Sequence, residues 1–381
     1  MSKLQNMVRW LLPYGMVNSY LRKNYQRRYG FITPFKQYME GTDKCVLVED
    51  CPYETIVSVQ GFGYSGSGAV VDLLREYDSA YVIGHIDAEG SVASQKFQCQ
   101  EVDILRLAGG LFEVEKYLGT NNVFQNDALL HRVISQITHS DIYQNNYAAR
   151  PYFYEFFGHI CEVMTQLPSR QWYNPYLNHN GATDILFLKD LTIAEYRNLC
   201  RKLLNSIFLI IKQSTVSKPI LVLDQITCDF EFDTARYRDY IPNLKLIMVY
   251  RDPRDVFSFA VKSNVEWIPH YSVDVFVKWY NSMLRHLDVN EHKQYHVVQF
   301  ENLVTNYDAV VAGVEQYVGL QAASHTKKNT CLDVSHSREN VGIWMQNEQL
   351  VESCKWIYKQ FESMCYQPYN NGIASSKQNK I

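Results

Sequence analysis

The feature that most constrains this chain is a short strand-like segment that runs into a glycine-rich loop and then into a helical pattern. Residues 55–59 are mainly apolar and β-branched, as in a buried parallel strand, and apolar side chains recur at helical spacing from residue 69 onward. Between these segments lie four glycines: Gly61, Gly63, Gly66 and Gly68. Glycines let backbone N–H groups turn inward, and the first amides of a helix carry partial positive charge. The segment therefore predicts a phosphate-binding turn, with a plain strand-to-helix turn as the alternative.

Two known nucleotide-binding loops can be compared with this segment. The spacing Gly61-x-Gly63-x-x-Gly66 fits the dinucleotide-binding fingerprint, and Asp87 lies near the distance at which that fold places a ribose-binding acid. A loop ending in Gly-Lys-Ser/Thr is absent, which counts against an ordinary ATPase or kinase. The glycine loop alone leaves the choice open, because one loop of this composition fits several folds.

Composition narrows the class of protein. With 381 residues the chain can bury a full globular core. Its formal net charge of −3 gives no overall attraction to nucleic acid. No apolar run approaches the ~20 residues that cross a bilayer, and no signal segment is evident at the N-terminus. The nine cysteines form no CxxC pair, so neither a metal site nor a disulfide framework is expected. These features favour a cytoplasmic protein.

Strand-like and helix-like segments alternate along the chain. Further buried strands are expected at 80–84, 219–224 and 244–250. This alternation predicts an α/β fold with a mainly parallel sheet flanked by helices. We divide the chain as follows: a basic aromatic N-terminal arm at 1–50, a main domain at 51–366 with a helical insertion at about 110–214, and a polar tail at 367–381.

The two ends of this division carry interpretations of their own. Residues 1–39 mix basic side chains with aromatic and aliphatic ones and contain no acidic residue. Such a segment suits the surface of an anionic membrane, and an arm that packs on its own domain is the equal alternative. Within the insertion, residues 143–180 are rich in aromatic and amide side chains, which suit a polyhydroxylated ligand or a helical core.

A second motif, far downstream of the glycine loop, helps to interpret that loop. Arg251-Asp-Pro-Arg-Asp-Val directly follows an apolar strand, downstream of a Ser-Gly-Ser loop. This combination resembles the sulfotransferases that use 3′-phosphoadenosine 5′-phosphosulfate (PAPS). The resemblance implies a P-loop-type fold in which the loop holds the 5′-phosphosulfate and Arg251 contacts the 3′-phosphate, and it implies no metal. It assigns donor binding to Gly63, Tyr64, Ser65, Gly66, Ser67, Gly68, Ala69, Arg251, Ser258 and Arg338.

Other elements follow in the family's order. Residues 295–304 look like the strand and turn before a late helix at about 308–318, and residues 337–344 look like the loop that covers the 3′-phosphate end of the nucleotide. The insertion resembles loosely that of bacterial sulfotransferase-like proteins of surface-polysaccharide pathways. The resemblance thus implies transfer of a sulfuryl group to a hydroxyl of a carbohydrate or related acceptor.

The departures from the family bear on activity. The family usually has Lys or Arg where Tyr64 stands, and a Lys-Thr/Ser pair where Asp224-Gln225 stand. The serine that binds the 3′-phosphate corresponds to Phe259, so Ser258 lies one position early, and Arg254 or Lys262 is expected to compensate. A non-catalytic member that binds a nucleotide or glycan is therefore the alternative, and a Rossmann NAD(P)-binding oxidoreductase ranks last.

The expected catalytic base lies after the second strand. His85 falls nearest the position that the family uses, with Asp87 and Glu89 behind it, while Glu101 and Asp103 fit a second segment of the family. A hydroxyl acceptor must lose a proton during transfer, so one of these groups is expected near it. We favour His85, because an imidazole accepts a proton near neutral pH.

Overall fold

The structure is a computed structural model, and most of the chain from residue 31 to 367 can be described. The described residues are 31–61, 63–83, 101–116, 118, 130, 133–134, 137–138, 140–166, 183–214, 218–226, 234–284 and 295–367. They fall into two compact units. The described residues within 31–52 and 106–214 form the helical unit, and those within 53–83, 101–105 and 218–367 form the sheet unit.

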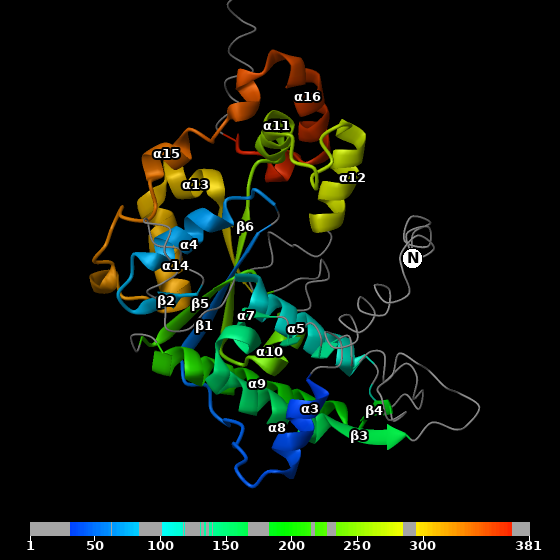
Figure 1. The fold of residues 1–381 in the computed structure, drawn as a ribbon. Coiled ribbons are helices and arrows are strands. Elements are labelled where there is room, and N and C mark those ends of the chain that lie inside the picture. Colours follow the sequence, from blue (N-terminus) through cyan, green and yellow to red (C-terminus); the bar gives the residue numbers. More distant parts are fainter. Residues whose placement is uncertain are drawn as a thin grey trace, which may run out of the picture. The chain divides into compact units, whose positions relative to one another are not determined.

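Within its described residues, the sheet unit is built on one five-stranded sheet (Figure 1). Its strands are β1 (Thr55–Gly61), β2 (Ala80–Val82), β5 (Ile220–Asp224), β6 (Leu244–Tyr250) and β7 (Tyr295–Gln299). They pair in the order β2-β5-β1-β6-β7, and every pair is parallel. The α/β fold with a parallel central sheet is thus confirmed, because each apolar run predicted as a buried strand forms one.

The strand order places a switch in chain direction between β1 and β6. The chain leaves β1 toward β2 on one side of the sheet and leaves β6 toward β7 on the other side. Ligands of open α/β sheets bind at such a point, beyond the carboxyl ends of the strands. The order also differs from the dinucleotide-binding arrangement, in which the strand after the glycine-loop helix lies next to the first one. Here β5 separates β1 from β2, so the Gly61-x-Gly63-x-x-Gly66 match lacks the fold to which that fingerprint belongs.

Helices cover this sheet. The α-helices of the sheet unit are α4 (Ser67–Arg75), α10 (Thr234–Tyr240), α11 (Pro253–Ser263), α12 (Val273–Leu284), α13 (Phe300–Thr305), α14 (Tyr307–Val318), α15 (Val334–Arg338) and α16 (Val351–Gln360). Apolar side chains of α4 and α14, such as Leu73 and Val314, share one buried cluster with Val57 of β1 and Val249 of β6. Helices α11, α12 and α16 pack together around a second cluster that includes Phe257 and Phe276 (Figure 1).

Short 3-10 helices connect several of these elements. In the sheet unit they are η3 (Ala322–Ser324), η4 (Ile343–Gln346), η5 (Glu348–Leu350) and η6 (Glu362–Met364). Helix α14 ends at Gly319, whose φ of 87° is the left-handed conformation that glycine adopts readily at a helix end. The late helix predicted at about 308–318 is therefore confirmed with its stop signal.

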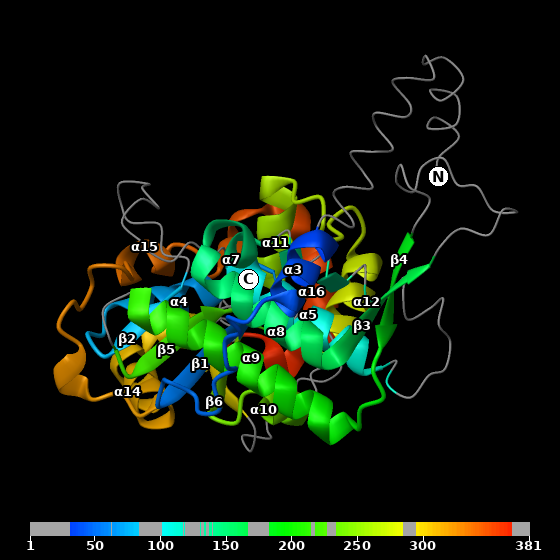
Figure 2. The same cartoon turned by 60° about the horizontal axis from the view of Figure 1, so that its bottom comes forward.

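The helical unit contains a feature that the periodicity did not predict. Its elements are α3 (Ile32–Glu40), α7 (Asp141–Asn145), η2 (Tyr147–Ala149), α8 (Arg150–Ile160), β3 (Cys161–Gln166), β4 (Thr183–Leu188) and α9 (Ile193–Ser214), together with most of α5 (Glu101–Glu115). Strands β3 and β4 pair antiparallel as a hairpin, visible in Figure 2. The insertion expected to be helical at about 110–214 thus also contains a hairpin: the pairing joins Cys161 to Leu188, a long-range contact that local periodicity does not report.

The described end of the N-terminal arm packs on its own unit. Phe31, Ile32 and Phe35 are buried, and the rings of Phe31 and Phe35 lie 6.0 and 6.3 Å from that of Phe157 in α8. Residues 31–39 thus follow the alternative in which the arm packs on its own domain. Residues 1–30 lie outside the described part.

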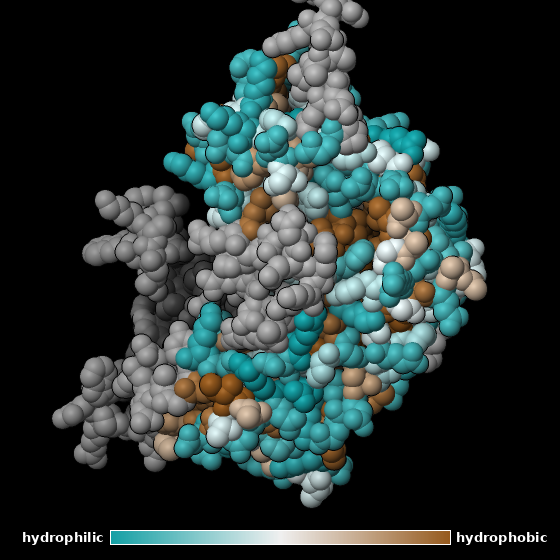
Figure 3. Space-filling view, turned by 180° about the vertical axis from the view of Figure 1, so that it is seen from behind, coloured by the Kyte–Doolittle hydropathy of each residue, from teal (hydrophilic) through white to brown (hydrophobic). Residues whose placement is uncertain are grey.

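No helix among the described residues is both long enough and apolar enough to cross a membrane. On the face in Figure 3, hydrophilic residues predominate and hydrophobic ones form scattered patches.

Candidate functional site

The glycine loop turns the chain from β1 into α4 with a backbone that other residues cannot easily adopt. Gly66 is the residue before α4 and has a φ of 88°. A Cβ built on Gly66 would lie 2.3 Å from the ring of Phe300, so both the conformation and the space require glycine. Helix α4 then begins at Ser67, and the first amides of an α-helix have no partner inside the helix. The loop thus presents backbone donors at the carboxyl end of β1.

Ser65 adds a hydroxyl to this cradle. The residue is buried, and its Oγ has no hydrogen-bond partner among the described residues. A buried hydroxyl without a partner is costly, and native structures leave few of them unexplained. An oxyanion at the start of α4 would supply the missing acceptor.

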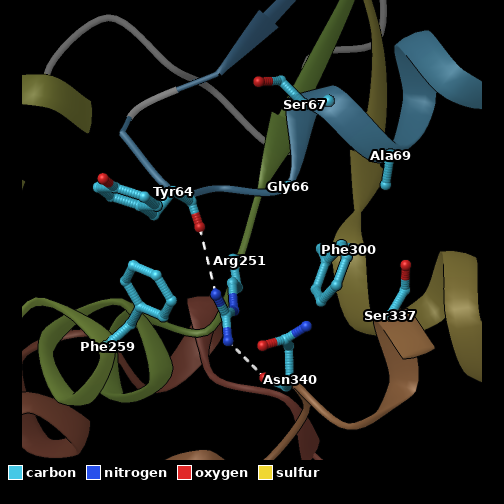
Figure 4. A pocket seen from close by; sticks show the side chains of 10 residues that line it. Tyr64, Gly66, Ser67, Ala69, Arg251, Phe259, Phe300, Ser337 and Asn340 are labelled. Atoms are coloured by element: carbon cyan, nitrogen blue, oxygen red, sulfur yellow. Dashed lines mark hydrogen bonds between the residues drawn. The ribbon is translucent and has the colours of Figure 1, made fainter. Parts of the chain in front are cut away.

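Arg251 lies beneath the same loop. It directly follows β6 and is only 4% exposed, yet it forms no ion pair with any described carboxylate. Its guanidinium donates hydrogen bonds to the backbone carbonyls of Tyr64 (3.4 Å) and Asn340, and its Nε has no partner among the described residues (Figure 4). The guanidinium carbon also lies 5.3 Å from the centre of the Phe300 ring. Carbonyl contacts orient this cation, and it interacts electrostatically with the buried Asp255, whose pKa it lowers against the effect of burial.

A pocket opens between the loop and Arg251. Its volume is about 310 Å³. It is lined by Tyr64, Gly66, Ser67, Gly68, Ala69, Arg251, Phe259, Phe300, Ser337 and Asn340. Figure 4 shows the rings of Tyr64 and Phe259 on one side of Arg251, with Phe300, Ala69 and Ser337 on the other. Of the described residues that line the pocket, Arg251 alone is charged.

The second arginine of the motif has a different environment. Arg254 is 1% exposed, and its Nη2 lies 2.5 Å from Oδ2 of Asp252, which also caps α11 by accepting from the Arg254 amide. Its guanidinium packs 4.4 Å from the centre of the Trp344 ring. The expectation that Arg254 replaces the family's serine at the 3′-phosphate is therefore wrong, because its guanidinium is paired with the Asp252 carboxylate inside the core. Lys262 lies exposed on α11 and does not line the pocket.

Two buried carboxyl groups support the floor of the pocket. Asp255 accepts hydrogen bonds from the amides of Gly342 (2.7 Å) and Trp344 (3.1 Å), and burial raises its pKa to about 6. Glu301 accepts from the amide of Asp252, and burial raises its pKa to about 8. These contacts tie the end of β6, the start of α13 and the segment 337–344 into one structure.

Two of the donor-binding residues assigned by resemblance lie elsewhere. Ser258 is buried, with its Oγ 3.8 Å from Sγ of Cys354, and does not line the pocket. Arg338 is exposed and donates to the carbonyl of Val304 at 2.8 and 3.1 Å, also outside the pocket. The segment 337–344 does reach the pocket, but through Ser337 and Asn340.

The sequence analysis did not assign four lining residues: Phe259, Phe300, Ser337 and Asn340. Ser337 and Asn340 flank the residue that was chosen, and the short helix α15 decides which of its side chains faces the pocket. Phe300 starts α13 directly after β7, so its position at a parallel strand end was the available signal. Gly63 and Ser65 stay in the loop next to the pocket without lining it.

The side chains expected to provide the catalytic base all lie outside the described part of the structure. His85, with Asp87 and Glu89, lies outside the described residues. Glu101 and Asp103 fall in the first turn of α5, and their side chains also lie outside the described part. Within the described residues, no group of three or more His, Cys, Asp or Glu side chains is arranged to hold a metal ion.

Comparisons with known proteins find sulfotransferase domains among solved structures. No family model and no curated protein matches the chain. The sulfotransferase domain of the Synechococcus PCC 7002 olefin synthase is 11% identical, over 84% of this chain and 98% of that one, with a TM-score of 0.37. The sulfotransferase STF9 of Mycobacterium avium is 10% identical, over 90% and 82%, with a TM-score of 0.34. The sulfotransferase domain of the curacin biosynthetic pathway is 12% identical, over 81% and 97%, with a TM-score of 0.35. Superpositions this loose carry no argument, so the proposal below rests on the site.

Proposed function

We propose that this protein is a sulfotransferase that takes its sulfuryl group from PAPS and delivers it to a hydroxyl of a carbohydrate or related acceptor. The observation that carries the proposal is the buried Arg251, which lies directly beneath the glycine loop and forms no salt bridge with a described carboxylate. An Arg whose hydrogen bonds go to backbone carbonyls, beside the first amides of a helix, is an anion site in which two groups of donors converge. The order of the sequence motifs then favours a donor with phosphates at two positions.

The residues present fit the charged end of such a donor. Ser65 Oγ and Arg251 Nε are buried polar atoms without partners, and Gly66 and Gly68 keep side chains out of the cradle. In the proposed complex, the first amides of α4 hold the 5′-phosphosulfate, with Ser65 behind them in the loop, and Arg251 holds the 3′-phosphate with Ser337 beside it. Bound PAPS supplies the activated sulfuryl group. The chain's part is to orient that group and to stabilise charge.

A non-catalytic nucleotide-binding protein is the second candidate, favoured by one observation. Tyr64 occupies the place of the family's usual cation, and Arg251 is the only charged group among the described lining residues. Transfer needs stabilisation of the leaving group, commonly several kcal/mol for such a donor. Turnover of PAPS separates the two candidates, because both bind the nucleotide.

The test is calorimetric titration with adenosine 3′,5′-bisphosphate, compared with NAD and ATP. We expect preferential binding of the bisphosphate, and Arg251→Ala should weaken it at least about tenfold, since a charge-assisted phosphate contact is worth roughly 1.5–3 kcal/mol. Lys262→Ala is the matched control, because it removes one exposed charge from α11 outside the pocket. Unchanged affinity in Arg251→Ala with a normal circular dichroism spectrum would contradict the assignment.

A further inference from the structure

Three aromatic rings lie in contact between the pocket and the solvent. The rings of Phe259 and Tyr64 both line the pocket, with centres 4.5 Å apart and planes tilted by 37°. The indole of Trp267 stacks on Tyr64, at 5.6 Å and an interplanar angle of 19°. Tyr64 is 42% exposed and Trp267 58%. Large aromatic side chains this exposed beside a polar pocket are typical of ligand-binding surfaces.

The glycine loop is shaped around this stack. A Cβ on Gly63 would lie 1.9 Å from the Trp267 ring, so the glycine leaves room for the indole. Tyr64 itself has a φ of 58°, a left-handed conformation that costs a non-glycine residue free energy and concentrates at functional sites. The side chain of Tyr64 is thus held in this place at a conformational cost.

The loop that carries Trp267 is also fixed. His270 Nδ1 lies 3.1 Å from the carbonyl of Val265 and 3.0 Å from that of Ile268, and its Nε2 lies 3.0 Å from Oδ1 of Asn264. Ile268, next to Trp267, is fully buried. The exposed indole therefore projects from an anchored loop, and a ligand that stacks on it pays little ordering entropy.

We propose that the Tyr64–Trp267 stack is the acceptor subsite, and that it binds a neutral sugar ring through its flat C–H face; this inference rests on the proposed function. The stack adjoins the residues that would hold the sulfuryl end of the donor, which is where an acceptor hydroxyl must arrive. Phe300, across the pocket, leaves a separate apolar wall for the base of the nucleotide (Figure 4).

The chemistry of the stack selects the class of acceptor. Its three side chains are uncharged, and Arg251, the only charged group among the described lining residues, belongs to the donor. A pyranose ring offers an apolar face to the indole and hydroxyl edges to the tyrosine hydroxyl, which matches side chains with an apolar body and a polar tip.

The experiment is saturation-transfer NMR on the full chain saturated with adenosine 3′,5′-bisphosphate, with the methyl glycopyranosides of glucose, galactose, mannose and N-acetylglucosamine as probes. We expect transfer to ring C–H protons of at least one glycoside. That transfer should disappear in Trp267→Ala and persist in part in Trp267→Phe. Trp356→Ala is the matched control, because it removes another exposed tryptophan, on α16.

Calorimetry with the bisphosphate on the same samples separates this inference from the proposed function. A wild-type protein that does not bind the bisphosphate contradicts the proposed function. A wild type that binds it but shows no glycoside transfer, or a Trp267→Ala variant with unchanged transfer, overturns only the acceptor subsite. A tenfold loss of bisphosphate affinity in Trp267→Ala also overturns it, because the stack would then bind the base of the nucleotide.

Discussion

Two arginines of one short motif, three residues apart, have opposite environments in this protein. Arg251 donates to carbonyl oxygens, packs on Phe300 and lines a pocket, whereas Arg254 is paired with Asp252 and covered by Trp344. The difference follows from position, since Arg251 directly follows β6 and Arg254 lies in the first turn of α11. A cation without a direct carboxylate contact is available to a ligand, and a cation with one is part of the core. The comparison predicts that substitution of Arg254 mainly lowers the free energy of unfolding, whereas substitution of Arg251 mainly lowers nucleotide affinity.

The largest effect is expected from Arg254. Arg254→Met should lower the free energy of unfolding by about 3–5 kcal/mol, because it leaves the buried Asp252 carboxylate without its partner. Arg251→Met, measured by the same urea titration, should cost less, about 1–3 kcal/mol, since two hydrogen bonds to backbone carbonyls are lost but no ion pair. Equal losses in the two variants would erase the distinction between the two arginines.

A smaller effect, dependent on pH, is expected from Glu301. Its carboxyl group holds its proton more tightly in the folded chain, where its pKa is about 8, than in the unfolded chain, where it is 4.5. The folded state therefore binds more protons between these values, and the free energy of unfolding should fall as pH rises, by up to about 1.4 kcal/mol per pH unit. The interval from pH 6.5 to 8 isolates Glu301 from Asp255, whose pKa is about 6 and acts in the same direction.

Glu301→Gln tests this linkage. The glutamine oxygen can still accept from the Asp252 amide, so the contact remains while the titration is removed. Urea unfolding at several pH values should then show a flatter slope from pH 6.5 to 8 in the variant. A slope identical to that of the wild type would show that the carboxyl group of Glu301 is not the source.

The same two arginines show what the sequence could predict. The strand 244–250 and the helix after Asp252-Pro are local patterns, and both were predicted because apolar runs and helix-start residues act over a few positions. Arg251 lines the pocket, and its role at the donor stays a prediction. The burial of Arg254 was not predictable, because its cover, Trp344, is remote in sequence and comes close only in the folded sheet unit.

Other parts of the site divide in the same way. The turn at Gly66 follows from glycine spacing, and the structure has it. Whether Arg338 or Ser337 reaches the pocket depends on which face of the five-residue helix α15 turns inward, and so short a helix has no periodicity to decide this. Asn340 lies just beyond that helix. The hairpin β3–β4 was missed for a related reason, since strand pairing is set by a partner and not by local sequence.

The smallest effect is expected from Asp255, which connects the two environments. Its carboxylate holds Gly342 and Trp344, and the same segment supplies Asn340, whose carbonyl accepts from Arg251. Asp255→Asn keeps one acceptor but turns an amide N–H₂ toward the second backbone donor, so the segment should loosen. Affinity for adenosine 3′,5′-bisphosphate should then fall about fivefold, which is ~1 kcal/mol.

Limited proteolysis within 337–344, with and without the bisphosphate, measures the same loosening of the segment. We expect cleavage of Asp255→Asn to be faster than that of the wild type when no nucleotide is present. Arg338→Ala is the matched control, because this exposed side chain on the same segment donates to the Val304 carbonyl outside the pocket. If Arg338→Ala, and not Asp255→Asn, abolished protection by the nucleotide, then Arg338 would have to leave Val304 on binding. In that outcome Arg338 would bind the nucleotide, as the sequence predicts, and Asp255 would not be what holds the segment in its binding position.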